Sequence, residues 1–544
     1  MTLAEAMIAT LKSHGVKFLF GVPGGGSSLD LIAAADRAGL HFILCRGETS
    51  AAIAAAVVGE LTGAPGVVLT AIGPGAASAV NGVAYAHLER APLILIADAR
   101  EEGEAIPPHQ VFDLQALFKP IAKACRRVTP ENGVAQFADL VSLVQRKPHG
   151  PVLVELSGSD AGQAVMPISN MAQQKVAADS QAVGTSDDPA AQEAANALLA
   201  DSRYPVLLIG LQAASPDSGA ELRRLAERLG CPLLTTYKAK GVVADGHAQM
   251  LGHFTGADGE GEALQRADLI IWAGVDPVEL IPVAWRYAAP LLVLSDVAGL
   301  EYPVPPAVVL SGPLPQTVDL LAAASAPSVW SGDEIAALRG NLRQRARLKG
   351  GNGHTAEDVV DAVITATAAT AAAGEDICFT VDAGAHMISA MAKIEARQAK
   401  SVLKSTGLST MGFALPAAIA AALVTPERRV VAFTGDGGLM MCLAELSTAA
   451  RLGCRLTVVV LNDAALSLID VKQQRRQQQP VGVRYPAIDF AAAASGLGCR
   501  AWTVERDGPL LATIDAALAH EGAGLIDIRV DPAGYGDQLA ALRG

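Results

Sequence analysis

Two acidic residues follow neighbouring apolar stretches in the last third of the chain. Gly435-Asp436-Gly437-Gly438 closes the stretch 429–435, and Asn462-Asp463 closes the stretch 456–462. A strand–helix–strand unit brings the carboxyl ends of parallel strands to one edge of a sheet, so both acids can face a single ion. Glycine lets the backbone approach a phosphate, and a helix N-terminus offers it free N–H groups. These residues therefore permit binding of Mg²⁺ with a phosphorylated ligand, although a plain strand-to-helix turn would also explain Gly-Asp-Gly-Gly.

The elements that would position these acids belong to an α/β fold. Short apolar runs alternate with amphipathic, Ala-rich stretches along the chain, which is typical of doubly wound parallel sheets. The predicted strands cover 16–22, 41–46, 66–71, 92–97, 151–156, 205–210, 232–236, 268–274, 290–296, 377–382, 429–435, 456–462 and 524–530. We expect three α/β domains, at 1–165, 190–330 and 354–544, with linkers at 165–191 and within 297–352. Functional residues should lie at the carboxyl ends of the strands, where parallel sheets bind ligands.

Composition excludes several classes of protein. The 544 residues are 51% hydrophobic and 18% charged, which favours compact globular domains over disorder. A net charge of −13 argues against a nucleic-acid-binding surface. The seven cysteines form no CxxC pair, as expected of free thiols in a reducing compartment. Neither a signal peptide nor a membrane span is expected, so we predict a cytoplasmic protein.

Longer segments resemble the thiamine diphosphate (ThDP) enzyme superfamily, whose signature is Gly-Asp-Gly followed at some distance by Asn-Asn. The segment STGLSTMGFALPAAIAAAL (405–423) is similar to the stretch that precedes this signature in acetolactate synthases. GVPGGG (21–26), RGETSAA (46–52), IGPGAASAVNGVAYAHLERAPLILI (72–96) and FKPIAK (118–123) are similar to their N-terminal domain. The resemblance covers nearly the whole chain and is much more specific for the cofactor than for the substrate.

The resemblance implies a division of labour between the three domains. The N-terminal domain would bind the aminopyrimidine ring of ThDP and the C-terminal domain its diphosphate, with a central domain between them. In the family the cofactor lies between the first domain of one subunit and the third domain of another. We therefore expect ThDP and Mg²⁺ as cofactors, and a homodimer or homotetramer whose sites are shared between subunits.

The resemblance also assigns roles to single residues. Glu48 matches the glutamate that hydrogen-bonds the aminopyrimidine, and Met411 matches the residue beneath the bent cofactor. The metal ligands would be Asp436, Asp463 and the carbonyl of Ala465, with Asn462 bonding to nearby backbone instead. The full set assigned to cofactor binding is Pro23, Glu48, Gly75, Gly384, Ala385, His386, Ser409, Met411, Asp436, Gly437, Gly438, Asp463, Ala465, Leu466, Ser467 and Leu468.

Departures from the family pattern bear on the substrate. Gln110 matches a synthase glutamine near the reacting carbon, and its neighbour His109 is an acid/base candidate or an exposed loop residue. Some family decarboxylases have a His-His pair in the region of residues 100–115, which this chain lacks. Gly25 replaces a serine of benzoylformate-type decarboxylases. The predicted substrate residues are Gly25, Gln110, Ile469 and Lys472.

Further departures lie in the segment after Asp463 and in the central domain. Ser467 stands where the synthase pattern has glycine, and Lys472 begins KQQRRQQQ (472–479), a predicted cationic helix that would be near the site or simply solvated. FAD-binding relatives carry an arginine where this chain has Asp276, with no replacement cation nearby. We therefore expect no FAD.

Our leading hypothesis is a ThDP/Mg²⁺ enzyme that decarboxylates a 2-oxo acid and then performs carboligation, as acetolactate synthases do. The alternatives are a lyase that cleaves a 2-hydroxyacyl thioester or a diketone, a simple 2-oxo acid decarboxylase, and a degenerate regulatory paralogue without activity. A nicotinamide enzyme is disfavoured because GVPGGG lacks the GxGxxG spacing. No nucleic acid or membrane is expected among the partners.

Overall fold

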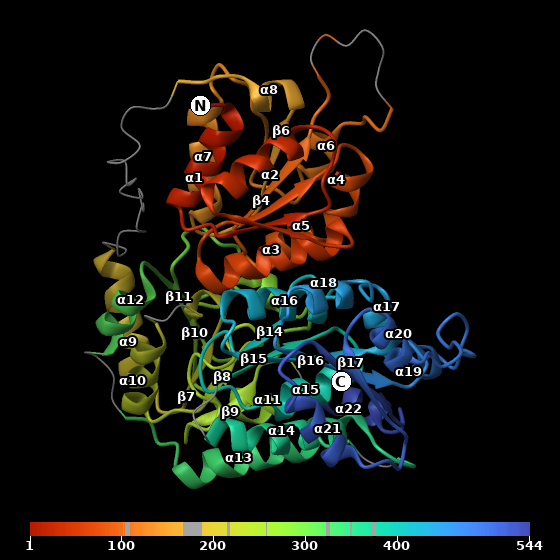
Figure 1. The fold of residues 1–544 in the computed structure, drawn as a ribbon. Helices are drawn as coiled ribbons and strands as arrows, with labels where there is room; N and C mark the ends of the chain where they lie inside the picture. The colour runs from red at the N-terminus through yellow and green to blue at the C-terminus, as the bar shows by residue number, and fades with distance from the viewer. Residues whose placement is uncertain are drawn as a thin grey trace.

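The computed structural model describes residues 1–101, 103, 109–166, 188–214, 218–256, 258–322, 327–348, 351–372 and 376–543. Its strands form three six-stranded sheets in which all neighbours are parallel (Figure 1). Helices cover the sheets, so the α/β class with three parallel-sheet domains is confirmed.

The first sheet has the order β2(His41–Leu44), β1(Phe18–Gly21), β3(Gly66–Thr70), β4(Leu93–Asp98), β6(Val152–Leu156), β5(Ala124–Arg127). The central sheet has the order β12(Val308–Ser311), β11(Leu291–Ser295), β10(Leu269–Ala273), β7(Pro205–Ile209), β8(Leu233–Thr235), β9(Met250–His253). The third has the order β14(Val402–Lys404), β13(Ile377–Val381), β15(Arg429–Gly435), β16(Leu456–Asn462), β18(Gly524–Arg529), β17(Arg500–Val504). Counted within each sheet, the first and third share one strand order and the central sheet has another.

Helices follow most strands in the manner of doubly wound sheets. In the first domain they are α1(Leu3–Ser13), α2(Ser27–Ala38), α3(Glu48–Thr62), α4(Pro74–Ser78), α5(Val80–Leu88), α6(Leu114–Phe118), α7(Gly133–Gln145) and α8(Gly158–Gly162). Next come α9(Pro189–Asp201), η1(Leu211–Ala213), α10(Gly219–Leu229), α11(Asp258–Arg266), η2(Pro277–Glu279), α12(Leu314–Ala322) and α13(Gly332–Arg345). The third domain contains α14(Ala356–Ala372), α15(His386–Lys393), α16(Ala414–Val424), α17(Asp436–Met440), α18(Glu445–Arg451), α19(Ser467–Arg475), α20(Phe490–Gly496), α21(Leu510–Leu518) and α22(Tyr535–Arg543).

The structure bears on only one of the two predicted linkers. Most of the first, 165–191, lies outside the described residues, and α9 begins near its end. The second cannot occupy all of 297–352, because β12, α12 and α13 fall within that range. Pro and Ser are frequent there, but they surround an edge strand and two helices. In the described part of the chain, no helix has both the length and the apolar character that crossing a bilayer requires.

The first and third domains share one apolar core. Helix α3 is buried on all sides over Ser50–Gly59, and α16 is buried over Ala414–Ala422. Both helices are rich in alanine, which lets them approach closely, and they pack against each other beside α5 (Figure 1). The rings of Tyr85 on α5 and Phe413 before α16 lie 5.2 Å apart between centroids. Small side chains therefore join the two domains that the resemblance assigns to the cofactor.

The closeness of this packing can be tested at Gly82 on α5. A Cβ there would stand 2.9 Å from the backbone nitrogen of Ile53 and closer still to the side chain of Ala52 on α3. We expect Gly82→Val to lower the free energy of unfolding by about 1–3 kcal/mol through overpacking, measured by denaturant unfolding. Gly496→Ala is the control, because a Cβ on that helical glycine meets nothing. Equal stability of the two variants would contradict close packing of α3 and α5.

Candidate functional site

Asp436 and Asp463 lie at the carboxyl ends of the adjacent strands β15 and β16, as their spacing predicts. Asp436 accepts hydrogen bonds from the backbone nitrogens of Gly437 at 2.7 Å and Ala464 at 2.7 Å. Asp463 accepts from the Ser467 hydroxyl at 2.6 Å and from the nitrogen of Ala465 at 3.2 Å. The loop after β16 thus folds over Asp436, and Ala464 adopts a φ of +59° to make the turn.

The charge of Asp436 disfavours ionisation of Asp463. Burial, reinforced by the charge of Asp436, raises the pKa of Asp463 to about 7, while the Ser467 hydroxyl opposes the shift. Burial also raises the pKa of Asp436, against the hydrogen bonds from Tyr485 and the backbone. Asp436 is buried and Asp463 is half-buried, and two such acids held close together without a compensating cation create a site that favours a cation. Within the described residues, no cluster of three or more His, Cys, Asp or Glu side chains suits a metal, so backbone oxygens would have to complete the coordination.

The side chain of Asn462 has structural partners. Its side-chain nitrogen donates to the carbonyl of Ile488 at 3.0 Å and to Asp527 at 2.8 Å. These bonds tie the end of β16 to β18 and to the loop before α20. Of the polar pair that ends the strand, Asp463 is therefore the member that faces Asp436.

Glycines and an apolar wall surround Asp436. A Cβ on Gly437 would lie 2.6 Å from a Leu466 methyl carbon, 3.1 Å from the Tyr485 hydroxyl and 3.5 Å from the Met411 methyl carbon. Met411, Leu466 and Gly437 are therefore gathered at one place, as their assignment to one cofactor requires. Ser409, also assigned there, is exposed and has a φ of +52°. Leu468 instead packs against the core of the third domain.

His386 begins α15 at the switch point between β13 and β15. Its ring lies against the backbone of Gly435, 3.3 Å from where a Cβ would be. The side chain is buried, and its Nε2 has no hydrogen-bond partner within the described structure. Burial lowers the pKa of His386 to about 4, so the ring is neutral near pH 7 and can donate one N–H. An unpartnered buried donor beside Gly384, Ala385 and Gly435 fits a phosphate oxygen.

Two residues of the candidate site in the third domain are not predicted from the sequence. Tyr485 donates to Asp436 at 2.9 Å from a loop for which no local pattern indicates a role. Asp382, at the end of β13, accepts from the backbone nitrogens of Gly412 and Phe413 and from the Thr434 hydroxyl. Burial raises the pKa of Asp382 to about 6. An acid at a strand exit is the signal that singles out Asp436, and it applies equally to Asp382.

The residues expected to bind the aminopyrimidine ring lie at the strand exits of the first sheet. Glu48 is the first residue of α3, and one of its carboxylate oxygens lies 3.2 Å from a Cβ built on Gly75. Pro23 and Gly25 are exposed in the loop after β1, and Gly25 faces open space. The structure thus brings Glu48 and Gly75 together. In the described part of the chain, no contact joins Glu48 to Asp436 or Asp463.

Asp98 holds the loop after β1 and is another residue that the sequence does not single out. It is buried at the end of β4 and accepts from the Gly26 nitrogen at 3.2 Å, from the Ser27 hydroxyl at 2.7 Å and from the Ser28 nitrogen at 3.0 Å. The GVPGGG segment is therefore fixed by a carboxylate at the exit of β4, two strands away in the sheet.

The predicted substrate residues lie at exposed positions around the two halves. His109 and Gln110 form an exposed turn, with a φ of +71° at Gln110, and the backbone of Gln110 packs against Gly73 at the exit of β3. Residues 104–108 lie outside the described chain. Ile469 and Lys472 are exposed on α19. The cationic helix predicted for 472–479 ends at Arg475, because the chain turns there and residue 477 has a positive φ.

The expectation that no cation lies near Asp276 is wrong, because a cation that is distant in the chain lies beside Asp276 in the fold. Arg90, from the first domain, forms a bidentate ion pair with Asp276 at 3.0 and 3.1 Å. The two residues are far apart in the chain, so the local sequence around Asp276 does not predict their pairing. Asp276 also caps η2 in a capping box with Glu279.

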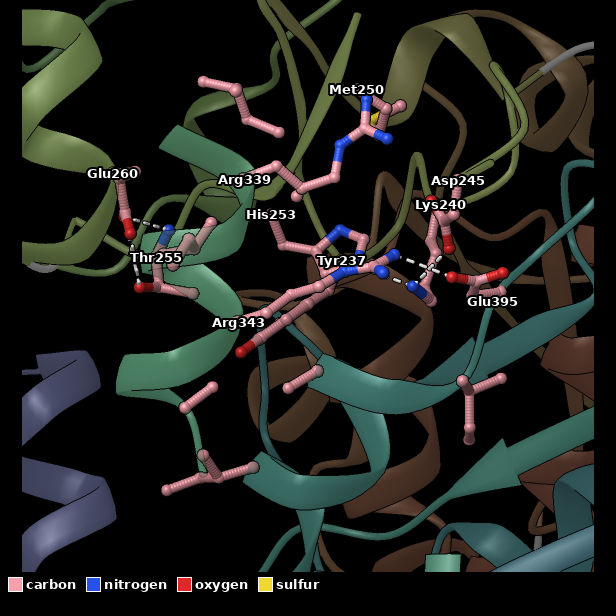
Figure 2. Close-up of a pocket in the computed structure, with 17 residues that line it drawn as sticks. Tyr237, Lys240, Asp245, Met250, His253, Thr255, Glu260, Arg339, Arg343 and Glu395 are labelled. Atoms are coloured by element: carbon pink, nitrogen blue, oxygen red, sulfur yellow. Dashed lines mark hydrogen bonds and ion pairs between the residues drawn. The ribbon is translucent and has the colours of Figure 1, made fainter. Parts of the chain in front are cut away.

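A cavity of about 70 Å³ lies apart from these residues, between the central and third domains (Figure 2). Buried Lys240 contacts Asp245 and lies 2.6 Å from Nε2 of His253, whose Nδ1 is 2.9 Å from the Thr235 hydroxyl. Figure 2 shows Lys240 and Asp245 on the side opposite Glu260 and Thr255, with His253 between them. Burial and the charge of Lys240 lower the pKa of His253 to about 3, so the ring stays neutral in the folded protein.

This histidine should make the protein sensitive to acid. The unfolded chain binds the imidazole proton near the ordinary pKa of 6.5, and the folded chain only near 3, so stability is lost as pH falls from about 6.5 towards 3. We expect His253→Gln to remove about 2 kcal/mol of the destabilisation at pH 5 relative to pH 7. Denaturant unfolding of both proteins at the two pH values measures the difference. An unchanged pH dependence in the variant would contradict a neutral His253.

The chain matches known protein families in each of its three domains. The chain matches the N-terminal TPP-binding domain of thiamine pyrophosphate enzymes over residues 1–117, their central domain over 192–290 and their C-terminal TPP-binding domain over 382–528. The three matches follow the order of the three sheets. The chain therefore belongs to the thiamine pyrophosphate enzymes.

Within this family the chain is similar to acetolactate synthases. It is 29% identical to the catabolic acetolactate synthase of Raoultella terrigena, over 97% of this chain and 95% of that protein. It is 27% identical to the acetolactate synthase of Bacillus subtilis, over 98% and 94%. It is also 27% identical to a Pseudomonas aeruginosa protein described as "Probable 2-ketoarginine decarboxylase", over 97% and 94%. The chain is thus a ThDP-dependent, acetolactate synthase-like enzyme of decarboxylation or carboligation.

Proposed function

We propose that the enzyme uses ThDP with Mg²⁺ to decarboxylate a 2-oxo acid and then joins the acyl unit to a second carbonyl compound. The observation that carries this proposal is the acid pair at adjacent strand exits beside Gly437 and Met411, in which Asp436 is buried and Asp463 is half-buried. Their mutual repulsion is what a divalent cation would relieve, and a diphosphate would complete its coordination.

The residues present fit both cofactors. Asp436, Asp463 and the Ala465 carbonyl would hold Mg²⁺, and the unpartnered Nε2 of His386 would donate to the diphosphate. Met411, next to Gly437, would support the cofactor from below. When bound, ThDP supplies a carbanion that adds to a carbonyl and a ring that accepts the electrons released by decarboxylation.

Glu48 is proposed to hold a proton on the aminopyrimidine and so to activate the cofactor. It stands at the start of α3, next to Gly75, at the exposed edge of the first sheet. Since Glu48 makes no contact with Asp436 in the described chain, the two halves of one chain would serve different cofactors. This supports a homodimer or homotetramer with shared sites, which we propose for a cytoplasmic enzyme.

Carboligation is favoured over the alternatives by the residues near the substrate. Gln110 occupies the exposed turn beside Gly73, while the paired histidines of some decarboxylases are missing from the sequence. A neutral amide can orient a carbonyl compound without delivering a proton, which favours the capture of a second carbonyl over protonation. Simple decarboxylation has some support from the similarity to the 2-ketoarginine decarboxylase-like protein. Analysis of the reaction products also tests the alternative of a lyase that acts on a 2-hydroxyacyl thioester or a diketone.

The role of Glu48 is tested by Glu48→Gln, which keeps the size of the side chain but removes its acidity. We expect exchange of the C2 proton of bound ThDP, followed by NMR, to slow by about 10²-fold or more. Glu279→Gln is a matched control, because Glu279 is a buried glutamate of the central domain that accepts backbone hydrogen bonds. Unchanged exchange in Glu48→Gln would overturn the assignment.

The substrate is tested with a panel of 2-oxo acids, supplied with ThDP and Mg²⁺, while CO₂ and organic products are measured. We expect CO₂ release together with condensation products. Aldehyde alone would indicate a simple decarboxylase, and cleavage of a diketone or 2-hydroxyacyl thioester without turnover of 2-oxo acids would indicate a lyase. Either result would contradict carboligation.

The additional charge of Asp463 should make diphosphate binding depend strongly on the metal. Asp463→Asn retains an oxygen ligand but removes one negative charge beside Asp436. We expect the ratio of ThDP affinities with and without Mg²⁺ to fall by about tenfold, equivalent to roughly 1.4 kcal/mol. Isothermal titration calorimetry with Mg²⁺ or with EDTA gives this ratio. Asp470→Asn on the neighbouring helix is the control, and an equal ratio in all three proteins would argue against Asp463 as a ligand.

A further inference from the structure

Two buried glutamates cross the boundary between the first and third domains. Glu89 follows the last residue of α5 in the first domain, and Glu445 is the first residue of α18 in the third. They are 1% and 2% exposed. Neither has a role in the function proposed above, although burying a carboxylate is costly unless its oxygens are hydrogen-bonded.

Glu89 binds the segment that leads to Met411. One of its carboxylate oxygens accepts from the backbone nitrogens of Thr406 at 2.6 Å and Gly407 at 2.9 Å, and lies 3.4 Å from that of Leu408. The Ser405 hydroxyl donates to the same oxygen at 3.2 Å. A first-domain carboxylate therefore gathers the successive N–H groups of a third-domain loop. After this loop the chain runs through Ser409, with its positive φ, to Met411.

Glu445 makes the converse contact. One of its oxygens accepts from the backbone nitrogens of Arg46 at 2.8 Å and Gly47 at 3.1 Å. Its other oxygen accepts from the Thr448 hydroxyl at 2.7 Å. Gly47 is the N-cap of α3 and Glu48 its first residue. A third-domain carboxylate therefore holds the backbone that carries the proposed activator of the pyrimidine.

Charge compensation differs between the two glutamates. Glu89 is 3.2 Å from Nζ of Lys238, which comes from the central domain and also contacts Glu60 at 2.7 Å. Burial raises the pKa of Glu89, while Lys238 acts in the opposite direction. Burial likewise raises the pKa of Glu445, and the Thr448 hydroxyl and the backbone nitrogens of Arg46 and Gly47 oppose it. Both carboxylates thus depend on the loop N–H groups that they bind, so each loop and its glutamate order each other.

We propose that Glu89 and Glu445 are positioning residues of the thiamine-dependent reaction, each holding from one domain the backbone of the other domain's cofactor-binding segment. This inference rests on the roles proposed for Glu48 and Met411. If the two halves of a chain serve different cofactors, the two contacts link the geometry of one site to that of the next. Neither glutamate needs to touch ThDP.

The test uses the full-length protein with Glu89→Gln, Glu89→Asp and Glu445→Gln, and Glu279→Gln as a matched control. Gln keeps the reach of the side chain without its charge. Asp keeps the charge, and with it the ion pair to Lys238, but draws the carboxylate away from the loop. Glu89→Asp therefore keeps the test available if Glu89→Gln does not fold.

The first readout needs no cofactor. Backbone hydrogen–deuterium exchange, followed by mass spectrometry on the cofactor-free protein, should speed up about tenfold or more at 405–411 in the Glu89 variants and at 46–50 in Glu445→Gln. Glu279→Gln should leave both segments unchanged. Unaltered exchange at these segments in the variants would overturn the proposal.

The second readout separates positioning from general stability. We expect ThDP affinity, measured by calorimetry with Mg²⁺, to fall about tenfold in the Glu89 variants, because the support beneath the cofactor loosens. We expect C2 proton exchange to slow about tenfold in Glu445→Gln with little change in affinity. If the Glu89 and Glu445 variants lose only thermal stability, as Glu279→Gln should, the role of these glutamates is structural and the proposal fails.

Failure of this proposal can be distinguished from failure of the proposed function. If Glu48→Gln leaves C2 exchange unchanged, the assignment of Glu48 fails, whatever the Glu89 and Glu445 variants do. If Glu48→Gln stops the exchange while Glu445→Gln does not slow it, the function stands and the positioning role of Glu445 is overturned.

Discussion

The third domain is organised by the repulsion between two carboxylates that a parallel sheet forces together. Adjacent parallel strands end at the same edge, so Asp436 and Asp463 face each other once β15 and β16 pair. Burial raises the pKa of Asp463 to about 7, and the charge of Asp436 adds to the shift. The nearby N–H groups of Gly437 and Ala464 and the hydroxyls of Ser467 and Tyr485 each compensate part of this charge. The glycines, the turn at Ala464 and the unpartnered His386 are understandable as the surroundings of that strained pair.

Interior strands and strand-exit residues could be predicted from the sequence, but of the six edge strands in these three sheets only β2 was covered by a predicted stretch. Strands β5, β9, β12, β14 and β17, which no predicted stretch covers, are all at sheet edges. An edge strand such as β17, with its residues largely half-buried or exposed, carries no continuous apolar run. Motif spacing predicted that Asp436 and Asp463 lie at one edge, because sheet topology determines where strand exits meet, whereas Met411 was assigned there only by the resemblance.

The residues that escaped prediction act across long distances in the chain. Asp98, Tyr485, Glu89 and Glu445 all bind backbone or carboxylate groups of distant segments. A single acid at the end of a helix or strand reads equally well as a solvated cap, so its partner becomes evident only when the domains are packed. The same holds for Arg90 and Asp276, whose pairing corrects an expectation based on neighbouring sequence. Domain interfaces, rather than strand exits, mark the limit of what local pattern can establish.

The shared Ala-rich core has a consequence for synthesis on the ribosome. Helix α3 emerges early, yet α16, which covers it, belongs to the last domain to leave the ribosome. Until then the outer face of α3 has no partner, and a large apolar patch would invite aggregation. Alanine exposes little apolar area per residue, so exposing an alanine-rich helix to water costs little free energy. The composition that lets the two domains approach closely also makes the nascent first domain tolerable on its own.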